Sequence, residues 1–315
     1  MARVLVTRRL PDGGLDPLVA AGHEIVQRAD DTPYSPEDLR TAVAAVDGVV
    51  CLLTDRIDDA LLAAGGERLR VVANVAVGYD NIDVPAARAR GITVCNTPGV
   101  LDETTADLAF MLMLAAARLG HEAESDLREG RWLGWGINQY LGQDVHGATL
   151  GLVGYGRIGR AVARRAAGFG MNVLHHTRTD TGAPGWTGDL HHLLTVADFV
   201  SLHVPLTDAT RGLLGPAEFE AMKSTAVVVN TARGPVLDEA ALAAALQSGA
   251  IFAAGIDVFE REPEVHPALL AAPRAVLLPH VGSASVATRS RMARLACSGV
   301  VAVLAGETPP NVVGR

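Results

Sequence analysis

Cysteines, aromatic residues and long apolar runs are all scarce in this 315-residue chain. Its three cysteines, Cys51, Cys95 and Cys297, lie far apart within apolar segments and form no CxxC pair. We therefore interpret them as buried thiols in a reducing compartment rather than as disulfide partners. The longest apolar run, residues 108–117, falls well short of the roughly 20 residues that span a bilayer, so it predicts a buried helix. The apolar run at the N-terminus is too short for a signal peptide, and we expect a cytoplasmic protein with no membrane partner.

Positive charge is also in deficit, because the formal net charge is −8. A general nucleic-acid binder is more often basic, so no nucleic-acid partner is expected. Apolar residues make up 49% of the chain and charged residues 20%, which is typical of a globular protein with a sizeable core. The length suits about two domains.

Short runs rich in Val, Ile and Leu alternate with helical stretches along the whole chain. This rhythm predicts repeated βαβ units with parallel sheets that are buried on both faces. The expected strands are RVLVT, GVVCLL, RVVANV and ITVCN in the first hundred residues, and later ATLGLVG, MNVLHH, DFVSLH, AVVVN, AAGIDV and AVLLP. Helices are expected over about residues 103–119 and 285–305, and the tail 308–315 should pack back on the first domain.

The predicted fold class is therefore α/β, with two Rossmann-like or flavodoxin-like domains and a cleft between them. Residues 1–98 plus 286–315 should form a flavodoxin-like substrate-binding domain, and residues 99–285 a Rossmann domain that binds a dinucleotide. The chain crosses between the domains near 97–102 and 283–287, where we expect a hinge.

A glycine motif, GYGRIG, follows the first strand of the second series and precedes a helix rich in Arg and Ala. Gly154 would allow the tight turn, Gly156 the close approach of a pyrophosphate, and Gly159 the packing of helix against strand. Together with Arg157 and Ile158, which begin the helix, they are predicted to hold the phosphates of a dinucleotide.

The loop after the next strand decides which dinucleotide is expected. An Asp or Glu at this place would bind the ribose of NAD, whereas Thr177, Arg178 and Thr179 suit a 2′-phosphate. NADP(H) is therefore the preferred cofactor. NAD(H) remains possible if Asp180 binds the ribose instead.

Three later strand ends carry Arg233, Glu262 and His280, where ligands of open α/β sheets bind. Reduction of a 2-keto acid needs a hydride from a nicotinamide, a proton for the forming alkoxide and a cation for the carboxylate. His280 could supply the proton, Glu262 could stabilise the imidazolium, and Arg233 could orient the substrate.

The chain resembles the D-isomer-specific 2-hydroxyacid dehydrogenase family over nearly its full length. The matching stretches are NVAVGYDNIDVPAARARGITVCNTPG, GLVGYGRIGRAVA, HVPLTDATRGLLG, VVVNTARGPVLDEAAL, GIDVFEREP and LPHVGSAS. The resemblance implies that Arg233 binds substrate, that His280 is the acid/base and that Glu262 is its partner. It also implies a group of residues that line the cofactor site: Val204, Pro205, Thr231, Asp257 and Gly282.

Within that family, HHTRT is similar to the glyoxylate/hydroxypyruvate reductase branch, although His176 and Thr177 replace the aromatic residue and Ser common there. The resemblance implies reduction of glyoxylate to glycolate and of hydroxypyruvate to D-glycerate. Val77 and Gly78 would form a small anion nest for the substrate carboxylate, close to Leu53. Trp135 resembles a residue that reaches the neighbouring subunit's site, or is simply buried in an interface, and both alternatives imply a homodimer.

Several alternatives stay open. The core also resembles NAD-dependent D-3-phosphoglycerate dehydrogenase and other D-2-hydroxyacid dehydrogenases, and the same scaffold serves as a dinucleotide-sensing corepressor that binds peptides. Formate dehydrogenase fits less well, since those relatives replace the Glu partner. No metal is expected, because the histidine pairs 175–176 and 191–192 lack an HExxH pattern or a cysteine cluster.

Overall fold

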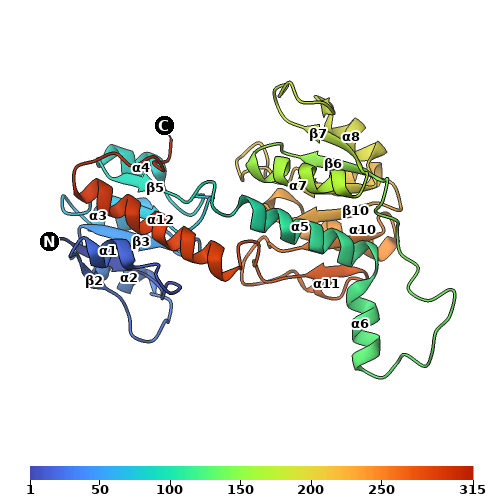
Figure 1. Cartoon of the computed structure of the whole chain (residues 1–315), viewed down its shortest axis with the longest axis horizontal. Helices are drawn as coiled ribbons and strands as arrows, with labels where there is room; N and C mark the ends of the chain where they lie inside the picture. The colour runs from blue at the N-terminus through green and yellow to red at the C-terminus, as the bar shows by residue number, and fades with distance from the viewer. Residues whose placement is uncertain (315) are drawn as a thin grey trace. The chain divides into compact units, whose positions relative to one another are not determined.

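The chain forms two compact units in the computed structural model, which describes residues 1–314 (Figure 1). Unit 1 comprises Met1–Leu101 together with the described residues from Ser283 onward, and unit 2 comprises Asp102–Gly282. These junctions differ by three residues from the domain limits expected from the sequence. Among the described residues, no helix has the length and apolar character that a membrane crossing requires.

Unit 1 is built on a five-stranded sheet in the order β2-β1-β3-β4-β5, in which every pair is parallel. This is the flavodoxin-like strand order. The strands are β1 (Arg3–Val6), β2 (Glu24–Val26), β3 (Gly48–Cys51), β4 (Val71–Asn74) and β5 (Thr93–Cys95). The helices are α1 (Asp16–Ala20), α2 (Pro36–Val43), α3 (Asp59–Ala64), α4 (Val84–Ala89) and the C-terminal α12 (Val286–Leu304).

Both faces of the unit 1 sheet are covered, which explains why its strands read as continuous apolar runs. Successive side chains of a strand point to opposite faces, so Val4 packs in a cluster with α12 while Leu5 packs in a cluster with α2 and α3. Figure 1 shows the long helix α12 lying across this sheet. The tail then returns to β5, where Val313 donates its N–H to Val94 at 2.8 Å, as predicted for its described part.

Unit 2 contains a seven-stranded parallel sheet in the order β12-β11-β10-β9-β6-β7-β8. The order reverses at β6, as in dinucleotide-binding sheets. The strands are β6 (Thr149–Val153), β7 (Asn172–His176), β8 (Trp186–Thr187), β9 (Phe199–Leu202), β10 (Val227–Asn230), β11 (Ala253–Ile256) and β12 (Ala275–Leu277). The α/β fold with two parallel sheets is thereby confirmed.

Helices cover both faces of this second sheet. The helices α5 (Asp102–Ala117) and α7 (Arg157–Gly168) contribute to the core on one face, and Figure 1 shows them running beside each other. The apolar run 108–117 lies in α5, so it is the buried helix that was predicted. The other elements of the unit are α6 (Gly120–Arg128), α8 (Leu190–Val196), α9 (Pro216–Ala221), the 3₁₀ turn η1 (Gly234–Val236), α10 (Glu239–Ser248) and α11 (Pro267–Leu270).

Three details depart from the expected elements. The strands β2 and β8 were not predicted, since they lie at the edges of their sheets and contain no fully buried residue. The helix expected over 103–119 ends at Ala117, because Leu119 adopts a left-handed conformation with φ 52° before α6 starts. An isolated residue at this φ is uncommon for a bulky side chain and separates the two helices.

Candidate active site

The strands of unit 2 end at one level, so the loops that follow them share one edge of the sheet. Val153 of β6 lies opposite Leu202 of β9, and Asn230 of β10 lies opposite both Leu202 and Ile256. Carboxyl ends of parallel strands therefore bring together loops that are far apart in the sequence. All of the residues predicted to bind the cofactor lie in these loops or at the start of the following helix, as do the three predicted catalytic residues.

The three motif glycines have different surroundings. Gly154 has φ 100°, and a Cβ there would lie 2.6 Å from the carbonyl oxygen of His203, so the turn tolerates only glycine. A Cβ on Gly159 would lie 2.3 Å from the Gly154 oxygen, which explains the close packing of α7 on the loop. A Cβ on Gly156 would meet nothing within 4 Å. Only this glycine therefore leaves open space beside the N-terminus of α7, as the approach of a phosphate requires.

Arg157 and Ile158 form the first turn of α7, whose leading N–H groups have no partner within the helix. Across the sheet edge, Val204 and Pro205 follow β9. The Pro205 carbonyl accepts a hydrogen bond from the Thr210 hydroxyl at 2.6 Å, which fixes the loop there. Helix N-terminus and β9 loop together have the geometry that a dinucleotide-binding edge needs.

The loop after β7 forms several hydrogen bonds that its sequence does not reveal. The hydroxyl of Thr177 donates to the Thr179 carbonyl at 2.7 Å and accepts from the Trp186 indole at 3.1 Å. Its single proton is therefore already used, which leaves Arg178 and Thr179 as the exposed donors of this loop. Arg178 forms no ion pair with any of residues 1–314, and Asp180 accepts the N–H of Gly182 at 2.8 Å.

His280 and Glu262 meet as the sequence predicted. His280 Nδ1 lies 2.8 Å from Glu262 Oε2, and the other carboxylate oxygen accepts the N–H of Phe259 at 3.0 Å. Burial raises the pKa of Glu262, but the hydrogen bond and charge of His280, the N–H of Phe259 and the charge of Arg233 together bring the pKa below its usual value. An ionised carboxylate on Nδ1 leaves Nε2 of the ring available for a substrate, since no described residue bonds to it.

Arg233 follows β10 on a short loop that Asn230 holds. The Asn230 side chain donates to the Arg233 carbonyl at 3.0 Å and accepts from the Ala232 N–H at 3.0 Å. The positive charge of Arg233 also contributes to the lowered pKa of Glu262, so the two side chains are close enough to interact. Next to them, the buried hydroxyl of Thr231 has no hydrogen-bond partner among residues 1–314. A buried hydroxyl without a partner is costly, and a polar ligand at this edge would satisfy it.

Asp257 organises the segment that follows His280. Its carboxylate is 1% exposed and accepts the N–H groups of Val281 at 2.7 Å and Gly282 at 2.8 Å, while its carbonyl accepts the His280 N–H at 2.8 Å. Burial raises the pKa of Asp257 to about 6, despite the lowering effect of these two hydrogen bonds and of His280. Three hydrogen bonds from one residue thus hold His280 at φ 55°, a conformation that most residues avoid.

Val77 and Gly78, which were predicted to form an anion nest, lie in unit 1. The carbonyls of Ala76, Val77 and Gly78 accept hydrogen bonds from the Thr97 N–H and from two side chains, Asn96 at 2.7 Å and Asn74 at 2.8 Å. In a trans peptide the N–H points away from the carbonyl. The N–H groups of Val77 and Gly78 are therefore turned away from these partners, as an anion-binding nest requires. The two asparagines were not singled out in the sequence, although both occur where a strand ends.

The remaining predicted residues differ in exposure. Leu53 follows β3 and is half-buried, beside a loop that Asn81 ties by donating to the carbonyls of Leu52 and Asp55. Trp135 is 80% exposed and belongs to a stretch between α6 and β6 with other exposed apolar side chains. The described residues contain no group of three or more His, Cys, Asp and Glu that could hold a metal ion.

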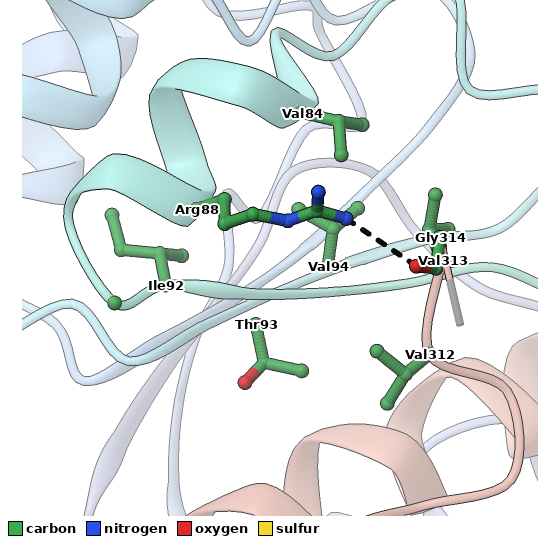
Figure 2. A pocket seen from close by; sticks show the side chains of 9 residues that line it. Val84, Arg88, Ile92, Thr93, Val94, Val312, Val313 and Gly314 are labelled. Atoms are coloured by element: carbon green, nitrogen blue, oxygen red, sulfur yellow. Dashed lines mark hydrogen bonds between the residues drawn. The ribbon is translucent and has the colours of Figure 1, made fainter.

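A cavity of about 430 Å³ lies elsewhere in unit 1, between α4, β5 and the C-terminal tail (Figure 2). Val84, Ile92 and Val94 line it, and Arg88 crosses it to reach the carbonyl of Gly314 at 3.4 Å. None of its lining residues belongs to the candidate site. A mostly aliphatic wall with one guanidinium offers no acid/base pair, so the cavity does not account for catalysis.

Comparison with known proteins identifies the family of the chain. Residues 110–282 match the family described as "D-isomer specific 2-hydroxyacid dehydrogenase, NAD binding domain". A glyoxylate reductase of Korarchaeum cryptofilum is 48% identical over 99% of this chain and 96% of its own. A glyoxylate reductase of Thermococcus litoralis is 43% identical over 99% of this chain and 97% of its own.

Solved structures agree over the whole chain. An NADPH-dependent glyoxylate/hydroxypyruvate reductase from Sinorhizobium meliloti, in complex with NADP and malonate, is 37% identical with a TM-score of 0.86 over 99% of this chain and 96% of that one. A protein from Thermus thermophilus is 45% identical with a TM-score of 0.92, over 99% of both chains. The chain belongs to the D-isomer-specific 2-hydroxyacid dehydrogenase family and is an NAD(P)-dependent oxidoreductase.

Proposed function

We propose that the protein reduces glyoxylate to glycolate and hydroxypyruvate to D-glycerate, with NADPH as the preferred hydride donor. The observation that carries the proposal is the 2.8 Å contact between His280 Nδ1 and Glu262 Oε2. Arg233 lies close enough for its charge to lower the pKa of Glu262. The activities of the similar proteins, glyoxylate reductase and glyoxylate/hydroxypyruvate reductase, support the choice of small 2-keto acids.

The roles follow from the chemistry of the side chains. Bound nicotinamide would supply the hydride that adds to the keto carbon and reduces it. His280 donates a proton from Nε2 to the carbonyl oxygen, while Glu262 stabilises the imidazolium through Nδ1 before that transfer. Arg233 holds the substrate carboxylate and the keto oxygen by a charge-assisted fork. The product is a 2-hydroxy acid.

The cofactor contacts are proposed from the loops of unit 2. Gly154, Gly156 and Gly159 with the first turn of α7 bind the pyrophosphate, and the open space at Gly156 supports this role. Thr231 fits a polar ligand through its unpartnered hydroxyl. The other residues proposed to bind the cofactor are Arg157, Ile158, Arg178, Thr179, Val204, Pro205, Asp257 and Gly282. The hydroxyl of Thr177, which was also predicted to bind it, is already bound within the protein.

The preference for NADPH rests on Arg178. Its guanidinium is exposed and without an ion pair among residues 1–314, and Asp180, the nearest acid in the sequence, is bound to the N–H of Gly182. A free cation at this loop attracts a 2′-phosphate, whereas NAD offers two neutral hydroxyls. NAD(H) remains an alternative cofactor for the same loop.

Unit 1 is proposed to bind the substrate carboxylate. The carbonyls of Val77 and Gly78 accept hydrogen bonds from asparagine side chains, which supports the proposal that their N–H groups bind an anion. Half-buried Leu53 favours a small side chain on the substrate. The reaction then needs residues from both units, so we propose that the units close over the ligands about the hinge segments 97–102 and 283–287. Solution scattering that detects no compaction with cofactor and substrate analogue present would contradict closure.

We further propose a homodimer through the stretch that contains Trp135. An 80% exposed indole in a run with Leu133 at 97% and Ile137 at 70% leaves apolar surface that a second copy of the chain would cover. Sedimentation analysis of the wild type and of Trp135→Asp tests this, because a charge in the interface would produce a monomer. A monomeric wild type contradicts the proposal.

Initial rates test the function directly. Glyoxylate and hydroxypyruvate are each assayed with NADPH and NADH, with His280→Gln as the control that keeps shape but lacks the acid. Turnover of both acids that His280→Gln abolishes, with NADPH preferred, supports the proposal. Faster turnover of D-3-phosphoglycerate with NAD favours that alternative dehydrogenase. Peptide binding that depends on NAD(H), without turnover, favours the corepressor.

A further inference from the structure

Glu239, the first residue of α10, is a buried acid with an unusual set of partners. It is 2% exposed, and acidic side chains are rarely buried so completely without a partner. No cation pairs with it among residues 1–314; instead its two carboxylate oxygens accept two backbone N–H groups. One oxygen accepts from Glu260, and the other accepts from His266 at 2.9 Å. The N–H of Glu239 in turn donates to the Glu260 side chain at 2.9 Å.

These partners bracket Glu262 along the chain. Glu260 lies two residues before it and His266 four residues after it, so one buried carboxylate ties both ends of the segment that carries the partner of His280. Glu262 itself cannot be held by burial, because its side chain is 27% exposed. Its place beside His280 therefore depends on where the backbone of this segment runs.

Gly234 positions the same segment from the side of Arg233. A Cβ on Gly234 would lie 1.9 Å from the carbonyl carbon of Phe259, so η1 and the segment after β11 pack backbone against backbone. Glu239 follows η1 by three residues and completes the contact by hydrogen bonds. The loop that presents Arg233 and the segment that presents Glu262 are thus joined through one short stretch of chain.

We propose that Glu239 is a positioning residue for the acid–base pair, holding the segment 259–266 so that Glu262 stays within reach of His280. The inference rests on the proposed function. A carboxylate suits this task because it offers an acceptor on each of two oxygens, to N–H groups that approach from two directions. An amide at the same place offers one acceptor and turns an N–H toward another N–H.

The residue before Glu239, Asp238, contributes to folding in general. Asp238 is the N-cap of α10, and its side chain accepts the Ala241 N–H at 2.9 Å. No hydrogen bond or ion pair links the side chain of Asp238 to the segment 259–266 within the part of the chain described. Loss of either acid weakens the start of α10, but only the loss of Glu239 releases the segment that carries Glu262.

The experiment compares Glu239→Gln with the matched control Asp238→Ala, by the pH dependence of kcat/KM for glyoxylate reduction and by the melting temperature. Glu262 and His280 form the acid–base pair, and Arg233 and Asp257 are the charged groups beside them. All four side chains remain in both variants. When Glu262 is free to move, the imidazolium loses its counter-charge. We expect Glu239→Gln to lower kcat/KM more than tenfold at pH 7.5 and to shift the high-pH limb toward lower pH. Asp238→Ala should lower the melting temperature and keep the wild-type limb.

Glu260→Ala extends the test to a residue that is itself exposed. It removes the acceptor of the Glu239 N–H, and we expect a smaller shift of the same limb in the same direction. Wild-type pH profiles in both Glu239→Gln and Glu260→Ala would overturn the inference, whatever their melting temperatures. His280→Gln separates the two levels: if it leaves the high-pH limb in place, the proposed role of His280 fails, and the inference on Glu239 fails with it.

Discussion

Replacing Gly234 by Ala tests how tightly the loops that carry Arg233 and Glu262 are packed. The added Cβ would lie 1.9 Å from the Phe259 carbonyl carbon and 2.0 Å from its oxygen, against about 3.5–4.0 Å for ordinary carbon contacts. The φ of Gly234 is outside the left-handed region, so only the collision matters. Because the obstacle is backbone, no rotamer change relieves it, and a destabilisation of about 3 kcal/mol, the upper end for overpacking, is expected.

The assay is thermal unfolding followed by circular dichroism, together with kcat/KM for glyoxylate. About 3 kcal/mol corresponds to a fall of roughly 6–12 °C in Tm for a domain of this size. The control is Gly168→Ala, where an exposed glycine ends α7 and a Cβ would meet nothing within 4 Å. Its Tm should stay the same or rise, since Ala favours helix. A Gly234→Ala protein that melts within about 2 °C of wild type with normal kcat/KM would refute the packing argument.

Three further outcomes are expected. Asp257→Asn should remove a pH dependence of stability. Because burial raises the folded-state pKa of Asp257 from 3.8 to about 6, the stability that its protonated form contributes is complete below pH 3.8 and is lost as the pH rises through 6, on the order of 3 kcal/mol. Urea unfolding between about pH 4 and 7 should show this loss of stability only in the wild type. Arg178→Ala should raise KM for NADPH by about 10–100-fold and leave KM for NADH nearly unchanged, whereas equal effects would refute the phosphate contact. The buried thiols Cys51, Cys95 and Cys297 should resist a disulfide reagent in the native protein, because burial raises the pKa of Cys95 to about 11 and of Cys297 to about 12; rapid labelling contradicts this.

The parts of the site that the sequence predicted are those that follow from the sheet alone. Parallel strands in register place their carboxyl ends together, so a motif after one strand and polar residues after others can be combined without knowing the coordinates. Arg233, Glu262 and His280 could be proposed as one site in this way. The glycine motif could be interpreted because its spacing reflects local backbone geometry, which the φ of Gly154 illustrates.

The parts that the sequence missed depend on contacts between distant segments. The edge strands β2 and β8 contain no fully buried residue, so the sequence lacks the apolar run that marks a strand there. Because β8 was missed, so was the hydrogen bond from the Trp186 indole to the Thr177 hydroxyl, and the loop was expected to offer one more hydroxyl than it does. The same holds for Glu239, whose neighbours in sequence indicate only the start of a helix.

A common arrangement connects the catalytic loops. Asn74, Asp257 and Glu239 are all buried, each ends or follows a strand or begins a helix, and all bind the backbone of a loop that carries a proposed site residue. A loop at the edge of a sheet cannot be fixed by apolar packing, because it must stay open to ligands. Such a loop can instead be fixed through its backbone N–H and carbonyl groups. A buried side chain with matching acceptors or donors holds these groups rigidly by hydrogen bonds. We therefore expect activity to depend on these three residues more strongly than the stability of either unit does, since each holds the backbone of a loop that carries a proposed site residue.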